Sequence, residues 1–551
     1  MSFIKCVHVE KAGTLNQLIP YNERDKITTL IITGFLEESD FDNVIDDMCR
    51  VEYDYEKSNF DEDNENLVID WDATPLLREL DMGGCEIVGK NFLPFFGSDS
   101  VLEKLIFPRN IDSTMTNNLE ESFGGCCLKS IYLPDTLKIL GGFGYNENLT
   151  ELIIPENVEE IYPLALSHCT SLKSINIPAK AKLKGNPFGG CSSLQHIELH
   201  PENPYYTIID NVLFTKDKKE LVAYPAGLPA KSYTIPISVE ILGEDAFEGT
   251  SLHYIIMPTG LKKVNRDCFM MCKNLQILDF PDSVEHIESR AISYCNSLYS
   301  VKLPSYISTI EINFSKCPKL KAISIPSSIK RISLDTLIWN EEGFETIILN
   351  EGLEEIYTEV GGIYCFTKKG NLKDITFPQS IKKIPSGIFH NCINIKAFNV
   401  HPENSYYTTI DGALCSKNGK ELVAVPNYSR TSYIIPDGIE EIQEGVFWRF
   451  SKLTKLILPN SLIKIGSRAF DSCHSLTEIT IPKNVTEIEE RAFDECNKLK
   501  TIIMLPLLPP IMNDKYQQSN LHKSITLCVP ASSVDTYKTH PFWSNYNIVA
   551  I

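Results

Sequence analysis

Residues 469–482, AFDSCHSLTEITIP, contain the pattern that decides the fold. Leu476, Ile479 and Ile481 are spaced by two variable residues and then by one, and Pro482 follows them. From Val101 onward the same spacing returns about every 23 residues, with further copies at 172–178, 298–304, 320–326, 372–378 and 453–459. Self-similarity at this period predicts a solenoid, because one such unit cannot bury its apolar face without stacked neighbours.

The strand motif places its last two hydrophobes one residue apart, as in a short β-strand whose side chains alternate between two faces. Proline ends the strand where a ladder N–H is no longer needed. After the proline, hydrophobes recur at three-residue steps, as at Val284 and Ile287 after Pro281, which is typical of turns or short 3-10 segments. We therefore predict an α/β repeat solenoid with one long parallel sheet of short strands and with turn or 3-10 segments on the other side.

Two gaps of 58 residues, 194–252 and 395–453, interrupt the repeat. Both contain a His-Pro-Glu-Asn sequence, a Tyr-Tyr pair and two apolar runs around a polar turn. This pattern predicts an inserted β-hairpin in each of two hairpin-bearing repeats, at 200–236 and 401–436. Since the gaps align at an offset of 201 residues, we infer that a block of the chain has been duplicated.

Eight of the 17 cysteines hold one position, three residues before the hydrophobe that opens the strand: Cys169, Cys191, Cys272, Cys295, Cys317, Cys392, Cys473 and Cys496. In five of these repeats a phenylalanine lies three residues earlier. Because an unmodified cysteine behaves as a small buried hydrophobe, we interpret this ladder as core packing rather than metal ligation or redox chemistry. No Cys-x-x-Cys pair or close His/Cys cluster has the spacing of a zinc site.

The two ends of the chain differ from its middle. Residues 27–34 and 76–82 carry the hydrophobic spacing without the proline. Solenoids need end caps with a polar outer face, so we expect an acidic N-terminal cap with divergent repeats at 1–100. The repeat solenoid is expected at 101–505, and a C-terminal repeat and cap, with aromatics that close the last coil, at 506–551.

The consensus Ala-Phe-x-x-Cys-x-x-Leu-x-x-Ile-x-Ile-Pro, best seen at 469–482, resembles the BspA-like leucine-rich repeat family over nearly the whole chain. The hairpin units resemble the family's inserted repeats, and 528–549 resembles its usual C-terminal end. Residues 7–15, VHVEKAGTL, are similar to the start of mature surface proteins of Bacteroides-type bacteria. The resemblance implies a leucine-rich repeat protein that is secreted or held at the cell surface and has a binding or adhesive role.

Charge and hydropathy exclude some partners. The formal net charge is −20, and residues 1–70 carry 17 Asp/Glu against 6 Lys/Arg, a net charge of −11. Such a field repels phosphate backbones and anionic lipid, so no nucleic-acid partner is expected. No run of eighteen apolar residues occurs, and we expect no membrane span. Residues 1–10 lack the basic and apolar regions of a signal peptide, which fits a cytoplasmic protein or a chain whose signal has been removed.

A search for catalytic motifs finds none of the common ones, and we predict a non-enzymatic protein without cofactor or metal. His168, His390 and His474 lie beside ladder cysteines, but the repeat turns neighbouring residues to opposite sides, which disfavours a Cys/His nucleophile. The best cation candidate is Asp61–Glu65. The glycine that a calcium loop needs at its sixth position is Asn66 here, so a solvated acidic loop is favoured.

Residues before and between the inward hydrophobes should line the exposed face of the sheet. The candidate partner-binding residues on this row are Tyr132, Ile153, Tyr254, Ile256 and Ile348. Exposed apolar residues of this kind tend to mark interaction sites. The alternative, which stays open, is that stacked β-branched residues stabilise the sheet by packing alone.

These observations predict a cell-surface or secreted protein that binds a protein or glycan in adhesion to a host or to other bacteria, with host extracellular matrix among the candidate ligands. The alternative is an intracellular scaffold for protein–protein interaction, which the abundant cysteine thiols would suit. A hydrolase is least favoured, because it would need clustered carboxylates with separated pKa values, and the acids on the exposed row are scattered.

Overall fold

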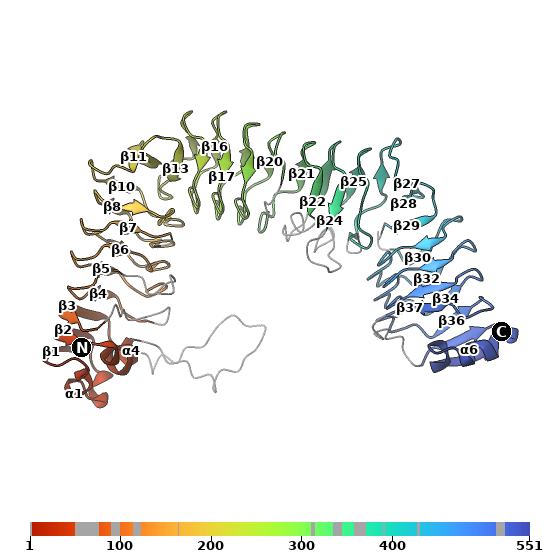
Figure 1. Cartoon of the computed structure of the whole chain (residues 1–551), viewed down its shortest axis with the longest axis horizontal. Coiled ribbons are helices and arrows are strands. Elements are labelled where there is room, and N and C mark those ends of the chain that lie inside the picture. The colour runs from red at the N-terminus through yellow and green to blue at the C-terminus, as the bar shows by residue number, and fades with distance from the viewer. Residues whose placement is uncertain are drawn as a thin grey trace. The chain divides into compact units, whose positions relative to one another are not determined.

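The structure is a computed structural model that describes residues 3–49, 76–89, 100–113, 123–163, 165–309, 314–333, 344–357, 371–389, 392–426, 430–513 and 524–551. The chain divides into two compact units, Met1–Leu275 and Gln276–Ile551. Within each unit, short coils with parallel strands are stacked in chain order (Figure 1). The predicted repeat solenoid is therefore confirmed.

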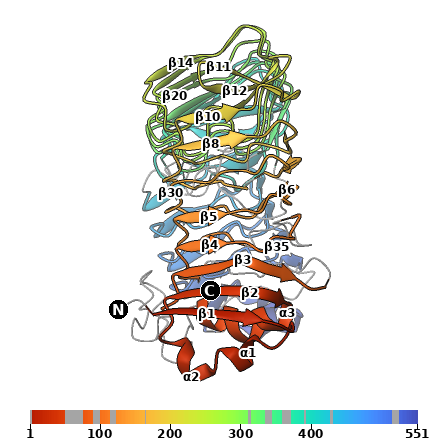
Figure 2. The same cartoon turned by 90° about the vertical axis from the view of Figure 1, so that its left-hand side faces the viewer.

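In the first unit, the strand motifs form parallel ladders. Five strands pair in chain order: β1 (Ile4–Val9), β2 (Thr29–Leu36), β3 (Glu79–Ile87), β4 (Lys104–Ile106) and β5 (Ser130–Tyr132) (Figure 2). They are followed by the pairs β8 (Ser174–Ile177) with β10 (His196–Leu199), and β14 (Ser232–Thr234) with β16 (Tyr254–Ile256). Equivalent hydrophobes face one another in register and are buried, as Leu80, Leu105 and Ile131 are.

The segment after each proline differs from the prediction. Turns are present, as predicted, but the second of the two hydrophobes spaced by three residues lies in a short strand rather than in 3-10 helix. In the first unit these strands are β6 (Ile139–Leu140), β7 (Glu160–Ile161), β9 (Lys182–Leu183), β15 (Ile241–Leu242) and β17 (Lys263–Val264). Each pairs in parallel with the equivalent segment of an adjacent coil, as β6 does with β7. Backbone pairing between coils favours an extended conformation of these segments. The residue pattern within a single repeat does not reveal this pairing.

The second unit repeats this arrangement. Its main strands are β18 (Ile277–Asp279), β20 (Ser300–Lys302), β21 (Ala322–Ile325), β23 (Thr346–Leu349), β25 (Asp374–Phe377), β26 (Asn399–Val400), β30 (Ser432–Ile434), β32 (Lys455–Ile457), β34 (Glu478–Ile481), β36 (Thr501–Met504), β38 (Thr526–Val529) and β39 (Asn547–Ala550). The second ladder contains β19 (His286–Ile287), β22 (Arg331–Ser333), β24 (Glu355–Tyr357), β31 (Glu441–Ile442), β33 (Lys464–Ile465), β35 (Glu487–Glu489) and β37 (Ile511–Asn513).

Helices in the described residues lie only near the two ends of the chain. The first unit has α1 (Leu15–Leu18), α2 (Tyr21–Arg24), α3 (Glu38–Asp40), a π-helix (Phe41–Ile45) and α4 (Asp46–Cys49). The second unit has α6 (Val534–Thr539) between 3-10 turns at Ala531–Ser533 and Trp543–Asn545. Among these helices, none is long and apolar enough to cross a bilayer. Tyr537 and Trp543 are buried, and they donate hydrogen bonds to the carbonyls of Pro506 and Pro510.

The cysteine ladder lies in the core, as predicted. The Cys169 thiol donates to the carbonyl of Phe143, and the Cys496 thiol to that of Phe470, at 3.3 and 3.1 Å. In both cases the acceptor is the phenylalanine position of the preceding coil. The rings stack as well, with 5.3 Å between the centroids of Phe470 and Phe493. Burial raises the pKa of Cys169 to about 12, so the thiol is a neutral hydrogen-bond donor between coils.

Each duplicated insertion contains three antiparallel strands and so two hairpins. The hairpin between the second and third strands is the one that the sequence predicts. In the first unit β11 (Tyr206–Ile209), β12 (Val212–Thr215) and β13 (Glu220–Ala223) are antiparallel neighbours. The second unit has β27 (Tyr407–Ile410), β28 (Ala413–Ser416) and β29 (Glu421–Ala424) in the same order. The turn between β11 and β12 has positive φ at Asp210 and Asn211, which these two residue types tolerate.

The His-Pro-Glu-Asn motif is structural. Asn203 is buried, and its amide donates to the carbonyls of Pro178 and Ala181 at 2.9 and 3.0 Å. Its side-chain oxygen accepts from the backbone N–H of Tyr205 and of Tyr206. Asn404 makes the equivalent bonds in the second unit. The asparagine therefore joins each insertion to the preceding coil.

Candidate protein-interaction face

Four of the five predicted partner-binding residues lie on the exposed face of the strands, and the fifth, Ile153, follows an isolated bridge at Glu151 in the same row. Their exposed fractions run from 43% for Tyr254 to 79% for Ile153, with Tyr132, Ile256 and Ile348 between 50 and 58%. The neighbours that alternate with them, such as Ile131 and Ile255, are buried. The strand geometry therefore places these side chains outward. Whether they bind a partner stays a prediction.

In the first unit, Tyr132 lies in what we call the Tyr132 patch, made of Ile106, Tyr132 and Ile153. Ile106 pairs in register with Tyr132, and a bridge between Ser130 and Glu151 brings Ile153 next to Tyr132 on the following coil. The Lys104 ammonium lies 5.6 Å from the centroid of the Tyr132 ring. The patch thus presents an aromatic ring and two aliphatic side chains from three successive coils.

Tyr254 and Ile256 form a second apolar site on the single strand β16, which we call the β16 pair. They are two residues apart and so share one face, and their register partners on β14 are the polar Ser232 and Thr234. Polar residues occupy the row between the Tyr132 patch and the β16 pair. One of them is Asn176, whose amide exchanges two 2.8 Å hydrogen bonds with the backbone of Ile154. The exposed row is therefore divided into separate patches.

In the second unit, Ile348 has polar register partners, Ser324 and Thr376. A stronger apolar site lies elsewhere, where Ile434 pairs in register with Ile457 and both side chains are exposed. The sequence did not single out Ile434, because its hairpin-bearing repeat lacks the hydrophobe that opens other strand motifs. The strand could have been found from the run Tyr433 to Pro436 alone.

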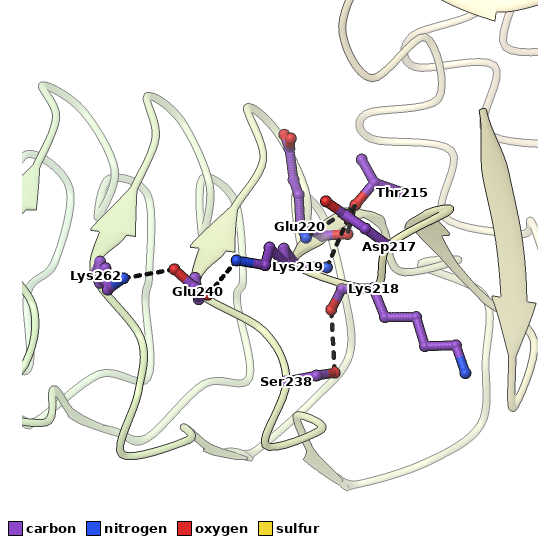
Figure 3. Close-up of polar contacts among 8 residues, drawn as sticks. All are labelled: Thr215, Asp217, Lys218, Lys219, Glu220, Ser238, Glu240 and Lys262. Carbon is purple, nitrogen blue, oxygen red and sulfur yellow. Dashed lines mark hydrogen bonds and ion pairs between the residues drawn. The ribbon is translucent and has the colours of Figure 1, made fainter.

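A charged ladder lies beside the second set of strands in the first unit (Figure 3). The Glu240 carboxylate pairs with Lys219 at 2.9 Å and with Lys262 at 2.6 Å. Hydrogen bonds from Lys262 and Lys219 lower the pKa of Glu240 to about 2. The adjoining turn is also internally bonded, since Asp217 accepts from Thr215 and from the Lys219 N–H. These charges neutralise one another across three coils, which leaves them poorly suited to recognise a charged partner.

A buried cluster of ionisable groups crosses several coils of the first unit. The His168 imidazole lies 3.2 Å from the Glu248 carboxylate, although 80 residues separate them in sequence. The intervening coil contributes Gly189 and Gly190, where a Cβ would come within 2.3 Å of Glu248 and 2.4 Å of His168. This glycine pair leaves room for the contact. The sequence pattern does not reveal this cluster, because the contact depends on the length of the inserted repeat.

Asp245 belongs to the same cluster. It is buried, and desolvation, followed by the charges of Glu248, Glu244 and Asp267, raises its pKa to about 8. Asp245 is therefore mostly protonated at neutral pH, which reduces repulsion among the four acids. A pKa shift of this size also occurs at functional sites, but here its causes are burial and like charge within a packed stack of coils.

Within the residues that the structure describes, no group of three or more His, Cys, Asp or Glu side chains could hold a metal ion. Asp61–Glu65 and His390 lie outside those residues. His168 and Cys169 contact different partners, as described above. His474 is exposed, and its Nδ1 lies 2.9 Å from the carbonyl oxygen of Glu495.

Stacked coils with parallel strands, a buried Phe/Cys ladder and an exposed strand face define a leucine-rich repeat solenoid. The sequence model of the BspA type leucine-rich repeat region, in six copies, matches residues 116–228, 226–342, 314–418 and 424–549. These matches cover more than half of the chain. The chain belongs to this family.

Similar solved structures are also leucine-rich repeat proteins. A leucine-rich repeat protein from Bacteroides ovatus is 21% identical with a TM-score of 0.38, over 75% of this chain and 88% of that one. A leucine-rich cell surface protein from Faecalibacterium prausnitzii is 18% identical with a TM-score of 0.40, over 63% and 95%. A leucine-rich repeat protein from Eubacterium ventriosum is 17% identical with a TM-score of 0.34, over 89% and 90%. No curated protein matches the chain.

Proposed function

We propose that this chain is a non-enzymatic binding protein of the bacterial surface, or a secreted one, that recognises a protein through the exposed apolar residues of its strands. The observation that carries the proposal is the β16 pair. Tyr254 and Ile256 are exposed on a short paired strand whose register partners on β14 are polar. Tyrosine is enriched among the residues that dominate protein–protein binding energy. A surface location is what the family resemblance implies.

The β16 pair is suited to binding because its backbone is already ordered. Both residues lie in a parallel ladder with β14, so little backbone entropy is lost when a partner docks. The buried Ile255 between them holds the strand against the core. We expect a protein as the partner, with glycans and host extracellular-matrix components as further candidates to be tested.

The experiment measures binding of the full chain to arrays of extracellular-matrix proteins and glycans, followed by titration of any saturable ligand. The Tyr254→Asp/Ile256→Asp variant should bind at least 100-fold more weakly, because two hot-spot residues contribute about 2 kcal/mol each or more. Ile237→Asp is the matched control, since Ile237 is 75% exposed but follows the strand rather than lying in it. Circular dichroism checks that all variants fold. Equal affinities of both variants and the parent chain would exclude the β16 pair.

An intracellular repeat scaffold is the second candidate. It is favoured by the cysteines of the described residues, which are all thiols and suit a reducing compartment. Treatment of intact producing cells with a non-permeant protease separates the two candidates. Digestion of the protein supports the surface proposal, and protection until lysis supports the scaffold.

A further inference from the structure

The first duplicated insertion carries an exposed tyrosine ring on a fixed backbone. Tyr205 is 40% exposed, although its N–H donates to the Asn203 side chain at 2.9 Å and its carbonyl accepts from the Lys216 N–H at 2.7 Å. The next residue, Tyr206, is buried, and its hydroxyl accepts from the Leu183 N–H of the preceding coil. Burial and bonding explain Tyr206, whereas the ring of Tyr205 faces solvent.

Lysine side chains lie on two sides of the Tyr205 ring. The Lys182 ammonium, on β9 of the preceding coil, is 5.5 Å from the ring centroid. Lys216 is directly opposite Tyr205 in the register of β11 with β12, and opposite residues of an antiparallel pair share one face. Lys180, two residues before Lys182, is exposed as well. An aromatic ring and three ammonium groups therefore belong to this part of the surface.

Lys182 and Lys216 lack the carboxylate partner that other lysines beside the second set of strands have. Lys184 pairs with Glu160 at 2.7 Å, and Glu160 is also the register partner of Lys182, so this carboxylate is already engaged. The Lys216 ammonium donates to a backbone carbonyl, that of Asn203, at 3.2 Å. In the part of the chain that the structure describes, no ion pair involves Lys182 or Lys216. Their positive charge is open to an anionic ligand.

The second insertion keeps the exposed ring but neutralises a lysine beside it. Tyr406 is 48% exposed, and its carbonyl accepts from the Lys417 N–H at 2.8 Å. Lys383 occupies the position of Lys182 at the offset of 201 residues, and it pairs with Glu355 at 2.8 Å. The chain therefore contains one insertion with a free ammonium group and a matched insertion in which a carboxylate occupies it.

A polyanion fits the first insertion by charge. Lysine-rich segments such as residues 180–184, KAKLK, are typical of surfaces that bind nucleic acid or heparin. Single-stranded nucleic acid is held by several successive aromatic rings on which its bases stack, whereas the ring at this surface is that of Tyr205. A sugar chain is a better match, because one sugar ring can pack its C–H groups on an aromatic side chain while its anionic groups bind ammonium groups.

We propose that Tyr205, Lys180, Lys182 and Lys216 form a binding site for an acidic polysaccharide, a sugar chain with sulfate or carboxylate groups. The lysines hold the anionic groups through charge-assisted hydrogen bonds, and the Tyr205 ring contacts a sugar ring. This site is separate from the β16 pair and does not depend on that pair being a binding surface.

The test titrates the full chain with a fluorescently labelled heparin octasaccharide at about 50 to 200 mM NaCl. Binding should be saturable, and its affinity should fall with salt with a logarithmic slope of about −2 to −3, since each ammonium group releases roughly one counterion. A hyaluronan octasaccharide, which has carboxylates and no sulfates, separates the two sources of anionic groups, and binding of either sugar supports the site. Equal or tighter binding of single-stranded DNA of the same charge would overturn the proposal.

The charge of the site is tested with two double variants. Lys182→Ala/Lys216→Ala should weaken heparin binding about tenfold or more and make the salt slope shallower by about two. Lys219→Ala/Lys262→Ala is the matched control, because it removes the same net charge from lysines that already pair with Glu240. The control should change the affinity less than about twofold.

The two insertions supply the control for the ring. Tyr205→Ala should weaken heparin binding about threefold or more, since stacking on one ring contributes to affinity, whereas Tyr406→Ala should leave it unchanged. Circular dichroism checks that all variants fold, and the titration of the parent chain does not depend on them. Absence of saturable heparin binding, or equal losses in the site variants and their controls, would rule out the site.

Discussion

Replacement of Asp245 by asparagine should stabilise the first unit in alkaline solution. Asp245 is 8% exposed, and burial together with Glu248, Glu244 and Asp267 raises its pKa to about 8. Its backbone has φ of 54°, a left-handed conformation that asparagine tolerates as well as aspartate. The substitution therefore keeps the shape and removes only the ionisation.

The size and sign of the change in the free energy of unfolding follow from the raised pKa of Asp245. The pKa rises from 3.8 to about 8, and four units at about 1.36 kcal/mol each set an upper limit of roughly 5 kcal/mol. Coupling to Glu248 and structural relaxation lower this, and we expect about 2–3 kcal/mol. Between pH 4 and 8 the folded state binds more protons than the unfolded state, so the parent's stability falls as pH rises through this window. The variant lacks this fall.

Urea unfolding of the full chain at pH 5, 7 and 9 measures the difference in the transition assigned to the first unit. The gain of the variant over the parent should grow with pH and level off above pH 8. Asp217→Asn is the control of opposite sign, because hydrogen bonds from the Lys219 N–H and Thr215 lower the pKa of Asp217. The Asp217→Asn variant should be less stable than the parent chain at all three pH values. Parallel stability curves for the parent and the Asp245 variant would refute the reasoning.

Two further substitutions test how coils are joined. Asn203→Ala should lower the free energy of unfolding by about 2–4 kcal/mol, because two buried carbonyls of the preceding coil lose their donor; a loss under 0.5 kcal/mol in urea titration would contradict this. Gly190→Ala should displace the His168 ring, which lies 2.4 Å from the added Cβ, and destabilise the chain more than Gly438→Ala does. Both glycines have positive φ, but the Cβ at Gly438 meets nothing within 4 Å, so equal melting temperatures would show that the contact does not matter.

The sequence predicted the features that repeat and missed those that depend on contacts between particular coils. Alternation along a strand is local, so burial of Ile131 and exposure of Tyr132 follow from the motif. Because the coils are stacked, the same alternation of buried and exposed residues recurs from coil to coil. The second ladder was missed because its short strands are stabilised by pairing between coils. The contact of His168 with Glu248 was missed because the two residues are 80 positions apart in sequence and meet only across the coil that carries the glycine pair.

The register of the exposed apolar residues bears on whether they serve binding or packing. Where such residues face each other, as Ile434 faces Ile457, the contact itself contributes about 0.2–1 kcal/mol to the sheet, and no partner is needed to explain it. Where the register partner on one side is polar, as Thr234 of β14 is for Ile256, the gain from that side is smaller. Ile256 and its neighbour on the same face, Tyr254, are nevertheless exposed. Packing therefore explains the β16 pair less well than the pair Ile434 and Ile457, and the test for a partner should begin at β16.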